Sequence, residues 1–192
     1  MSSAVPRQGK LIIIAAPSGA GKTTLCKKLL EELKDRLVLS VSCTTRQPRT
    51  GEKEGVHYHF ITPEAFQAKI KAGDFSEWAL VHGNHYGTSK SVIESTLAQG
   101  KSVLLEIDVQ GAASLKKSYG DRCFMIFIAP PSMKELQNRL EKRGTDSKET
   151  IERRLKNATD EMARSGEFHK LIINDIFDRA YAELRAEVQA HV

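Results

Sequence analysis

The sequence predicts an α/β fold in which helices cover both faces of a central parallel sheet. Short apolar runs alternate along the chain with segments whose apolar residues recur at helical spacing, a pattern typical of such sheets. The first run, Leu11–Ala15, leads into a glycine-containing turn and then into a helical pattern. Ligands of open α/β sheets bind beyond the carboxyl ends of the strands, so we expect the functional residues there.

Periodicity and turn residues place the expected elements along the chain. Strands are expected at 11–15, 37–41, 57–61, 75–81, 86–89, 102–108, 123–129 and 171–173. Helices are expected at 22–35, 62–73, 89–98, 133–143 and 148–163, with a last one marked by Ala180, Tyr181, Leu184 and Val188. Thr62 and Pro63 supply a helix start, and Gly73 supplies its end. The polar stretch 44–58 is rich in Arg, Gly and Pro and predicts a loop.

The turn after the first strand has the features of a phosphate-binding loop. Its small residues let backbone N–H groups surround phosphate oxygens, and the following helix directs its positive N-terminus at the anion. Lys22 can reach the β- and γ-phosphates of a nucleoside triphosphate, and the Thr23 hydroxyl can ligate Mg²⁺. The loop comprises Ala16, Pro17, Ser18, Gly19, Ala20, Gly21, Lys22, Thr23 and Thr24, with Ala16 where Gly is usual. Such a loop on a parallel sheet predicts the three-layer fold of P-loop NTPases.

The composition describes an ordinary globular protein. The 192 residues suit one domain, with 40% hydrophobic and 28% charged residues. No apolar run approaches the roughly 20 residues that cross a bilayer, and the N-terminus lacks the apolar core of a signal peptide. Cys26, Cys43 and Cys123 form no CxxC pair. We therefore expect free thiols in a reducing cytoplasm and no membrane association.

The net charge of +5 raises the question of nucleic-acid binding. Basic residues are dispersed and interleaved with acidic ones, and no RNP-like motif, zinc-finger spacing or uninterrupted basic run occurs. A pocket that accepts two polyanionic nucleotides explains the basic balance equally well. We therefore expect no nucleic-acid partner, and no residue pattern assigns an oligomeric state.

A second group of polar residues follows the first helix. Arg46 and Arg49 lie three apart in the predicted loop, so two guanidinium groups can converge on one phosphate. Tyr58 and Tyr86 supply neutral hydroxyl donors. Glu77 lies in a half-buried strand, where an unpaired carboxylate is costly, so it should meet a donor on the protein or on a ligand.

Taken together, these segments resemble the guanylate kinase family from the phosphate loop almost to the C-terminus. The matching runs are Ala16–Thr23, Ser42–Glu52, Gly83–Thr88, Leu105–Gly111, Arg143–Thr145 and Ile173–Asp175. The resemblance implies that a small mixed β insertion binds GMP and that a helical lid joins the core. It implies one domain over 1–192, with the core at 8–41, 90–136 and 162–192, the GMP-binding region at about 42–89 and the lid at about 137–161.

The resemblance also implies residue roles on the acceptor side. The GMP phosphate is held by residues matching Ser42, Arg46, Arg49, Tyr58 and Tyr86, and the guanine is read by residues matching Glu77 and Thr88. An ionised carboxylate accepts the N1–H and N2–H₂ of guanine as a pair, whereas adenine would leave that acceptor unpaired. Asp108 stands at a strand end, where it could hold Mg²⁺ through water or accept from guanine N2.

On the donor side, the resemblance implies Mg²⁺-dependent transfer of the γ-phosphoryl group of ATP to GMP, a cytoplasmic step of purine nucleotide metabolism. The phosphate loop then binds ATP, and Asn174 and Asp175 approach the adenine. Ile176 stands where an acidic or small polar residue is common. The implied catalytic residues are Lys22, Arg46, Arg139, Arg143 and Arg154, with Thr23 as the metal ligand.

Two other functions remain open. The chain could be a non-catalytic interaction module of the same fold, although such modules typically lose the phosphate loop or the lid arginines. It could also be a nucleoside monophosphate kinase with another base preference, although Glu77 and Thr88 favour guanine. The pairs His57–His59 and His82–His85 suggest a further metal site, but neither has a nearby Cys or acid cluster of recognisable ligand spacing.

Overall fold

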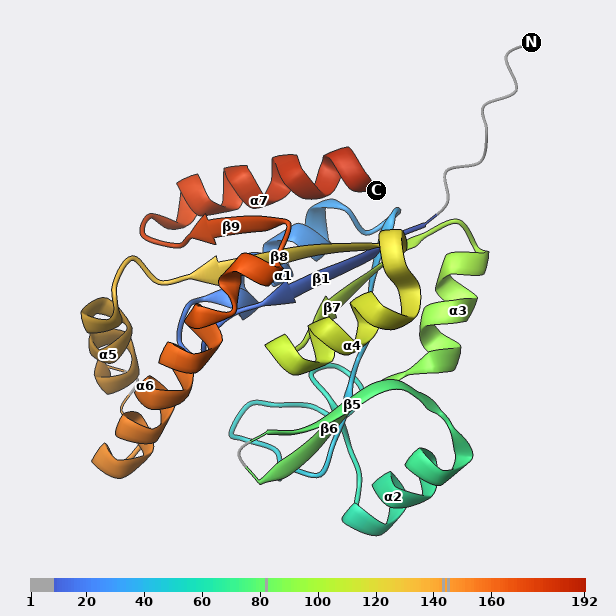
Figure 1. Cartoon of the computed structure of the whole chain (residues 1–192), viewed down its shortest axis with the longest axis horizontal. Coiled ribbons are helices and arrows are strands. Elements are labelled where there is room, and N and C mark those ends of the chain that lie inside the picture. Colours follow the sequence, from blue (N-terminus) through green and yellow to red (C-terminus); the bar gives the residue numbers. More distant parts are fainter. Residues whose placement is uncertain (1–8, 82, 143, 145) are drawn as a thin grey trace.

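Five parallel strands form the central sheet, in the order β2-β7-β1-β8-β9 (Figure 1). They are β1 (Leu11–Ala15), β2 (Leu37–Leu39), β7 (Ser102–Glu106), β8 (Cys123–Ala129) and β9 (Lys170–Ile173). The computed structural model describes residues 9–81, 83–142, 144 and 146–192. Because β1 lies between β7 and β8, the loop that follows it leaves the middle of the sheet.

The side chains of β1 divide the core into two layers. The covering helices are α1 (Lys22–Glu32), α3 (Lys90–Ala98), α4 (Val109–Tyr119) and α7 (Phe177–His191). Ile12 and Ile14 pack in a cluster with residues of α1 and α7, whereas Leu11 and Ile13 pack with residues of α3 and α4. A strand covered on both faces must be apolar throughout, because its side chains alternate between the faces. The predicted α/β fold with a central parallel sheet is therefore confirmed.

A second, mixed sheet lies below the first in Figure 1, in the order β4-β3-β6-β5. Its strands are β3 (Cys43–Thr44), β4 (His59–Phe60), β5 (Phe75–Val81) and β6 (Asn84–Ser89). Helix α2 (Pro63–Ala72) has both predicted caps, since the Thr62 hydroxyl accepts the Ala65 N–H at 3.2 Å and Gly73 has a φ of 72°. The whole unit is inserted between β2 and β7, as the mixed β insertion was expected to be.

Helices α5 (Met133–Lys142) and α6 (Lys148–Ala163) form a pair that begins just after the carboxyl end of β8 (Figure 1). They pack on each other through Leu136, Leu140 and Ala158. The end of α6 returns to the core, where Met162 packs against the cluster that contains Ala15 and Val109. The pair thus stands beside the carboxyl ends of the strands, in the region expected for a lid.

The sequence did not predict helix α4, nor strand β3 at the start of the expected loop 44–58. The strand expected at 102–108 ends at Glu106, because Asp108 caps α4 by accepting the Gly111 N–H at 2.7 Å. Val109, Ala112 and Leu115 form the buried stripe of this helix. The stripe is short, and Gly111 lowers the helix propensity of the segment, so the helical period is weak in the sequence.

The remaining expectations about the chain concern its cysteines and the membrane. Cys26, Cys43 and Cys123 are all free and buried, as the sequence predicted. Among the described residues, no helix is long and apolar enough to cross a membrane.

Candidate functional site

The phosphate loop joins β1 to α1 at the carboxyl end of the central strand. Gly19 and Gly21 have φ angles of 97° and 91°, a left-handed conformation that residues with a Cβ rarely adopt. Gly21 is the N-cap of α1, so the helix begins at Lys22 and leaves its first backbone N–H groups without helical partners. The backbone therefore has the conformation that an anion-binding turn requires.

Asn174, at the carboxyl end of β9, holds this loop in place. Its side-chain amide donates to the Ala20 carbonyl at 2.7 Å, and its backbone N–H donates to the Ala129 carbonyl at 2.7 Å. Asn174 is buried. A Cβ added at Gly21 would lie only 2.3 Å from the Asn174 amide nitrogen. Position 21 therefore needs glycine both for its φ angle and for the space beside Asn174.

Replacing Gly21 with alanine should weaken nucleotide binding more than it weakens the fold. The left-handed φ alone costs about 1–2 kcal/mol of stability, and the contact with Asn174 would also displace the loop. A displacement that costs about 1.4 kcal/mol weakens ATP binding about tenfold. Titration calorimetry with a non-hydrolysable ATP analogue measures this change, and thermal unfolding reports the fold.

Gly73→Ala is the matched control, because Gly73 has a φ of 72° and a Cβ there would meet nothing within 4 Å. It should lose comparable stability and keep its affinity for the analogue. Equal affinities of the Gly21→Ala and Gly73→Ala proteins would contradict the structural role of Gly21.

A basic cluster lies on the small sheet. Arg46 donates through Nε to the Tyr86 hydroxyl at 3.2 Å and forms an ion pair with Glu52 at 2.9 Å. Its guanidinium carbon lies 5.4 Å from the centre of the Tyr58 ring. Burial lowers the pKa of Arg46, but the hydrogen bonds to Glu52 and Tyr86 outweigh it and the pKa rises. The guanidinium therefore keeps its charge in a partly buried position.

The other residues expected around the acceptor phosphate lie on the small sheet, just before β3 or in the loop between β3 and β4. Burial raises the pKa of Tyr58 to about 12, so its hydroxyl keeps the proton that it can donate. Ser42 is buried just before β3, and the Arg49 side chain is exposed. Glu52 was missed by sequence reasoning, although it also accepts the Arg49 backbone N–H at 2.7 Å and so links both arginines.

Glu77 and Thr88 form a buried pair across β5 and β6. They are register partners in these antiparallel strands, and their exposed fractions are 7% and 0%. The Thr88 hydroxyl donates to Glu77 Oε1 at 2.5 Å. Burial, together with the nearby Asp108, raises the pKa of Glu77 to about 7 against the lowering effect of the Thr88 hydrogen bond. The donor that the sequence required for Glu77 is therefore Thr88.

Asp108 lies close to this pair. The position of a Cβ on Gly111 would be 2.7 Å from Glu77 Oε2 and 3.3 Å from Asp108 Oδ1. The two carboxylates therefore meet at the first turn of α4, which Asp108 caps. Gly111 leaves room for both, and any larger residue would collide with Glu77.

The predicted arginines on α5 and α6 contact the loop and the segment after β9. Arg154 donates to the Ser18 hydroxyl at 2.9 Å and pairs with Asp146 at 3.2 Å. Arg139 pairs with Glu135 at 3.1 Å and donates to the Asn174 carbonyl at 2.9 Å. Arg143, together with His82 and Thr145, lies outside the described residues.

Glu161, near the end of α6, is a second acidic residue that sequence reasoning missed. Burial, together with the nearby Asp108, raises the pKa of Glu161 to about 7 against the lowering effect of Lys22. It is one of 24 acidic residues in the chain, and nothing in the pattern of α6 distinguishes it. Glu161 can be recognised only from the three-dimensional structure, in which the end of α6 returns to the core at Met162.

The donor groups in this region fit Mg²⁺ bound together with a nucleotide. Thr23 lies in the first turn of α1, and Asp108 and Glu161 supply carboxylates near Lys22. The described residues contain no group of three or more His, Cys, Asp or Glu side chains placed to hold a metal. Mg²⁺ typically takes few protein ligands and completes its shell with phosphates and water, so this sparse oxygen set suits it.

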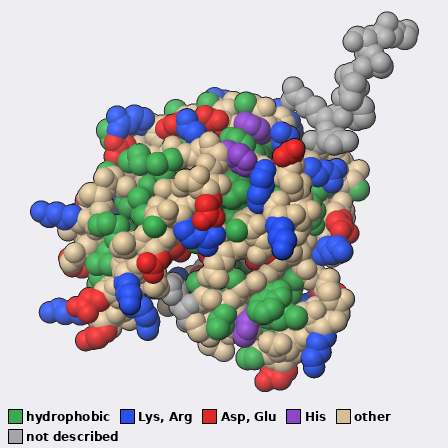
Figure 2. Space-filling view, in the orientation of Figure 1, with side chains coloured by type: hydrophobic (Ala, Val, Ile, Leu, Met, Phe, Trp, Pro, Cys, Tyr) green, Lys and Arg blue, Asp and Glu red, His purple; other side chains and the backbone are tan. Residues whose placement is uncertain are grey.

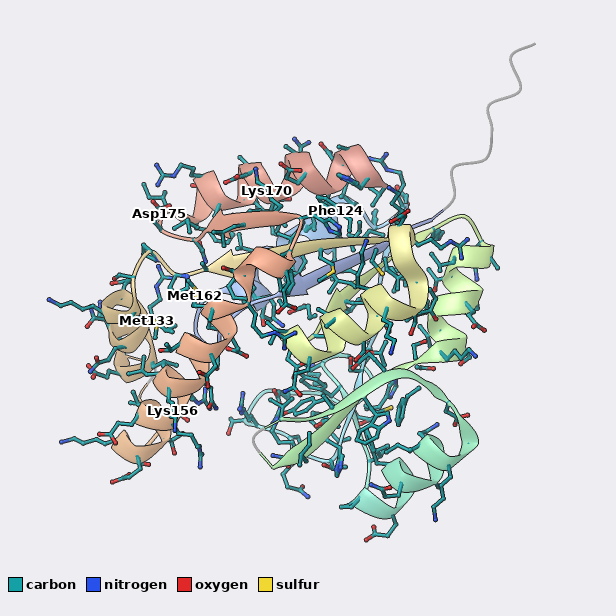
Figure 3. All side chains as sticks on the ribbon, viewed as in Figure 1. Phe124, Met133, Lys156, Met162, Lys170 and Asp175 are labelled. Carbon is teal, nitrogen blue, oxygen red and sulfur yellow. The ribbon has the colours of Figure 1, made fainter. Side chains whose placement is uncertain are left out.

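Figures 2 and 3 show the side of the molecule toward which the strands of the central sheet point. Met133 of α5, Met162 of α6 and Asp175 after β9 lie on the side toward which β8 and β9 point (Figure 3). Figure 2 shows the surface hollowed between the part formed by α5 and α6 and the part formed by the small sheet.

Comparison with known proteins agrees with this geometry. The family model described as guanylate kinase matches residues 8–191. A guanylate kinase of a Polaromonas species is 50% identical over 182 residues, covering 95% of this chain and 87% of the relative. A guanylate kinase of Hydrogenovibrio crunogenus is 52% identical over 178 residues, covering 93% and 86%. The crystal structure of guanylate kinase from Anaplasma phagocytophilum superposes with a TM-score of 0.79 at 32% identity, covering 96% of this chain and 86% of that one. The chain belongs to the guanylate kinase family.

Proposed function

We propose that this chain transfers the γ-phosphoryl group of ATP to GMP, giving ADP and GDP. The observation that carries the proposal is the buried Glu77–Thr88 pair beside a second phosphate-binding cluster. The phosphate loop alone would serve one nucleotide. Arg46 with Tyr58 and Tyr86 provides a second site, charged and lined by hydroxyl groups, on the small sheet. Two such sites suit a donor and an acceptor nucleotide.

Glu77 supports guanine as the acceptor base. Its ionised carboxylate can accept the N1–H and N2–H₂ of guanine together, and these two donors favour the ionised form. Adenine has a lone pair at N1 and no 2-amino group, so it would leave the buried acceptor unpaired. The closeness of Asp108 to Glu77 favours a role on the guanine side for Asp108 as well.

The reaction needs positioning and charge neutralisation more than proton transfer. The phosphate of GMP is largely dianionic at neutral pH, since its second pKa is about 6, and it can attack without a strong base. Arg46 and Arg49 orient the acceptor, while Lys22 and the loop N–H groups hold the donor phosphates. Thr23 would hold Mg²⁺ together with the phosphates, and the metal would supply further neutralisation of charge.

The arginines of α5 and α6 complete the donor side. Arg154 already contacts Ser18 of the loop. It can therefore stabilise the negative charge on the transferred group when the helices close on ATP. We assign similar roles to Arg139 and Arg143. Closure would also exclude water, which otherwise competes with GMP for the γ-phosphoryl group.

We place this activity in the cytoplasm, within purine nucleotide metabolism. The free, buried state of Cys26, Cys43 and Cys123 suits a reducing compartment. ATP and GMP are then the expected partners.

The test is ADP formation from MgATP with GMP, AMP, CMP and UMP offered separately at equal concentrations, beside a control without acceptor. Strong turnover with GMP alone is the expected result. Turnover with another nucleotide would support the assignment as a kinase and overturn the assignment of guanine as the acceptor base. A folded protein that binds GMP but turns over no acceptor would instead be an interaction module.

A further inference from the structure

Two ion pairs between described residues are much better shielded from water than the others. In Arg46–Glu52, on the small sheet, the side chains are 13% and 17% exposed. In Arg154–Asp146, on the α5–α6 pair, they are 13% and 11% exposed. An exposed ion pair contributes little to stability, whereas the loss of one partner from a shielded pair leaves a charge uncompensated. Each of the two pairs contains an arginine to which we assign a phosphate group, so an inference about them rests on the function proposed above.

Asp146 lies in the turn between α5 and α6. Gly144 and Ser147, its described neighbours on either side, are exposed, whereas the Asp146 side chain is shielded. The helix start does not depend on Asp146, because the Ser147 hydroxyl caps α6 by accepting the Thr150 N–H at 3.3 Å. The carboxylate at position 146 therefore needs another explanation, and its contact with Arg154 supplies one.

The guanidinium group of Arg154 divides its donors between two parts of the molecule. Its Nη2 donates to Asp146 Oδ1 at 3.2 Å, within the α5–α6 pair, and its Nη1 donates to the Ser18 hydroxyl of the phosphate loop at 2.9 Å. A guanidinium group is planar and rigid, so a contact that fixes one nitrogen also fixes the direction of the other. Asp146 thereby directs Nη1 toward the loop.

The second oxygen of Asp146 also favours a functional role. Oδ2 is buried and has no hydrogen-bond partner among the residues that the structure describes. A buried carboxylate oxygen without a donor costs stability, and departures of this kind are expected mainly at functional sites. A residue that served only to shape the turn would not need this costly carboxylate.

We propose that Asp146 is the positioning residue of Arg154: it holds one nitrogen of the guanidinium group so that the other faces the phosphoryl group that ATP transfers. Asp146 itself touches no substrate, so its whole effect on turnover passes through Arg154. Glu52 stands in the same relation to Arg46 on the acceptor side, where it accepts from Nη2 at 2.9 Å while Nε donates to Tyr86.

The experiment is a double-mutant cycle of Asp146→Ala and Arg154→Ala, measured as kcat with MgATP and GMP. Arg154→Ala should lower kcat about 10²-fold and Asp146→Ala about 10-fold, with the KM for GMP unchanged in both. The double variant should match Arg154→Ala alone, because Asp146 then has no guanidinium group to position. Asp146→Asn keeps a hydrogen-bond acceptor for Arg154 and should lose less activity than Asp146→Ala.

Ser147→Ala is the matched control for damage to the turn. It removes the cap of α6 at the neighbouring residue and leaves the Arg154–Asp146 pair intact. It should lower the Tm by about 2–4 °C and keep the kcat of the wild type. Thermal unfolding of every variant in the cycle shows whether it is folded at the assay temperature.

Two results would overturn the proposal. A residue that only stabilises the fold would lower kcat by the same factor with or without Arg154, so additive losses in the double variant are the first. A kcat that is unchanged or higher in Asp146→Ala is the second.

The proposed function can fail separately. If the wild-type protein phosphorylates no acceptor, the same cycle is measured on the affinity for a non-hydrolysable ATP analogue by titration calorimetry. There a loss in Asp146→Ala that disappears in the Arg154→Ala background supports the positioning role, and additive losses or no loss would overturn it.

Discussion

Replacing Lys22 with alanine should lower turnover of MgATP and GMP by about 10³-fold while the protein stays folded. Lys22 is the first residue of α1, directly after the glycine turn, where we propose that its ammonium group contacts the phosphates of ATP. Charge that develops on the transferred group would lose its nearest fixed cation. Lys22 is not among the core residues, so its truncation opens no cavity. Steady-state kcat at saturating ATP and GMP measures the effect.

Lys27→Ala provides the comparison on the same helix. Lys27 is exposed on α1 and should keep wild-type turnover when replaced. Thermal unfolding of both variants separates lost chemistry from lost structure. A Lys22→Ala protein that is folded and turns over within tenfold of the wild type would remove Lys22 from the mechanism.

The phosphate loop was predictable because its functional residues are contiguous in the sequence. Strand, turn and helix follow one another within 11–32, and each part has a local signature in the sequence. The partner of the loop was not predictable from physics alone. Asn174 reaches Ala20 across 154 positions of the chain, and only the parallel pairing of β8 with β9 brings it there.

The acceptor residues also divide into features that the sequence indicates and features that only the tertiary structure decides. The sequence indicates that Glu77 needs a donor, but the β5–β6 register decides that the donor is Thr88. The sequence did not decide whether Asp108 serves Mg²⁺ or guanine. Its capping role was not predicted either, because helix α4 was not predicted. The positions of Glu52 and Glu161 depend on a loop conformation and on helix packing. Neither of these produces a periodic pattern in the sequence from which it could be predicted.

Glu77→Gln should lower kcat/KM for GMP by about 10³-fold and leave ATP binding unchanged. A glutamine presents one acceptor and one donor to the N1–H and N2–H₂ of guanine. Its amide NH₂ would therefore face one of these guanine donors in a buried site, with no acceptor between them. Activity with AMP should not rise to the level lost with GMP. Glu94→Gln, at an exposed site on α3, should behave as the wild type. Equal GMP kinetics in the Glu77→Gln and wild-type proteins would exclude Glu77 as the base reader.

The same substitution predicts a characteristic pH profile. Because the pKa of Glu77 in the empty site is raised to about 7, the carboxylate that we propose as the guanine acceptor forms as pH rises through that value. In the wild type, kcat/KM for GMP should therefore fall as pH decreases below about 7, in addition to the titration of the GMP phosphate near about 6. Glu77→Gln should keep only the lower of these two transitions. Profiles of both proteins between pH 5 and 8.5 test this directly.

Stability should change in the opposite direction from activity. A carboxyl group with a folded-state pKa of about 7 and an ordinary value of 4.5 binds its proton more tightly when the protein is folded. Its contribution to the free energy of unfolding therefore decreases as pH rises from 4.5 to 7, by about 3 kcal/mol in total. At pH 8 the empty Glu77→Gln protein should unfold at higher temperature than the wild type, with the difference shrinking toward pH 5. Since GMP supplies the two N–H donors that the ionised carboxylate lacks, saturating GMP should raise the Tm of the wild type more than that of the variant. If Glu77 reads guanine as proposed, the stability lost by burying its ionised carboxylate is recovered only when guanine is bound, and the site is selective for this base for that reason.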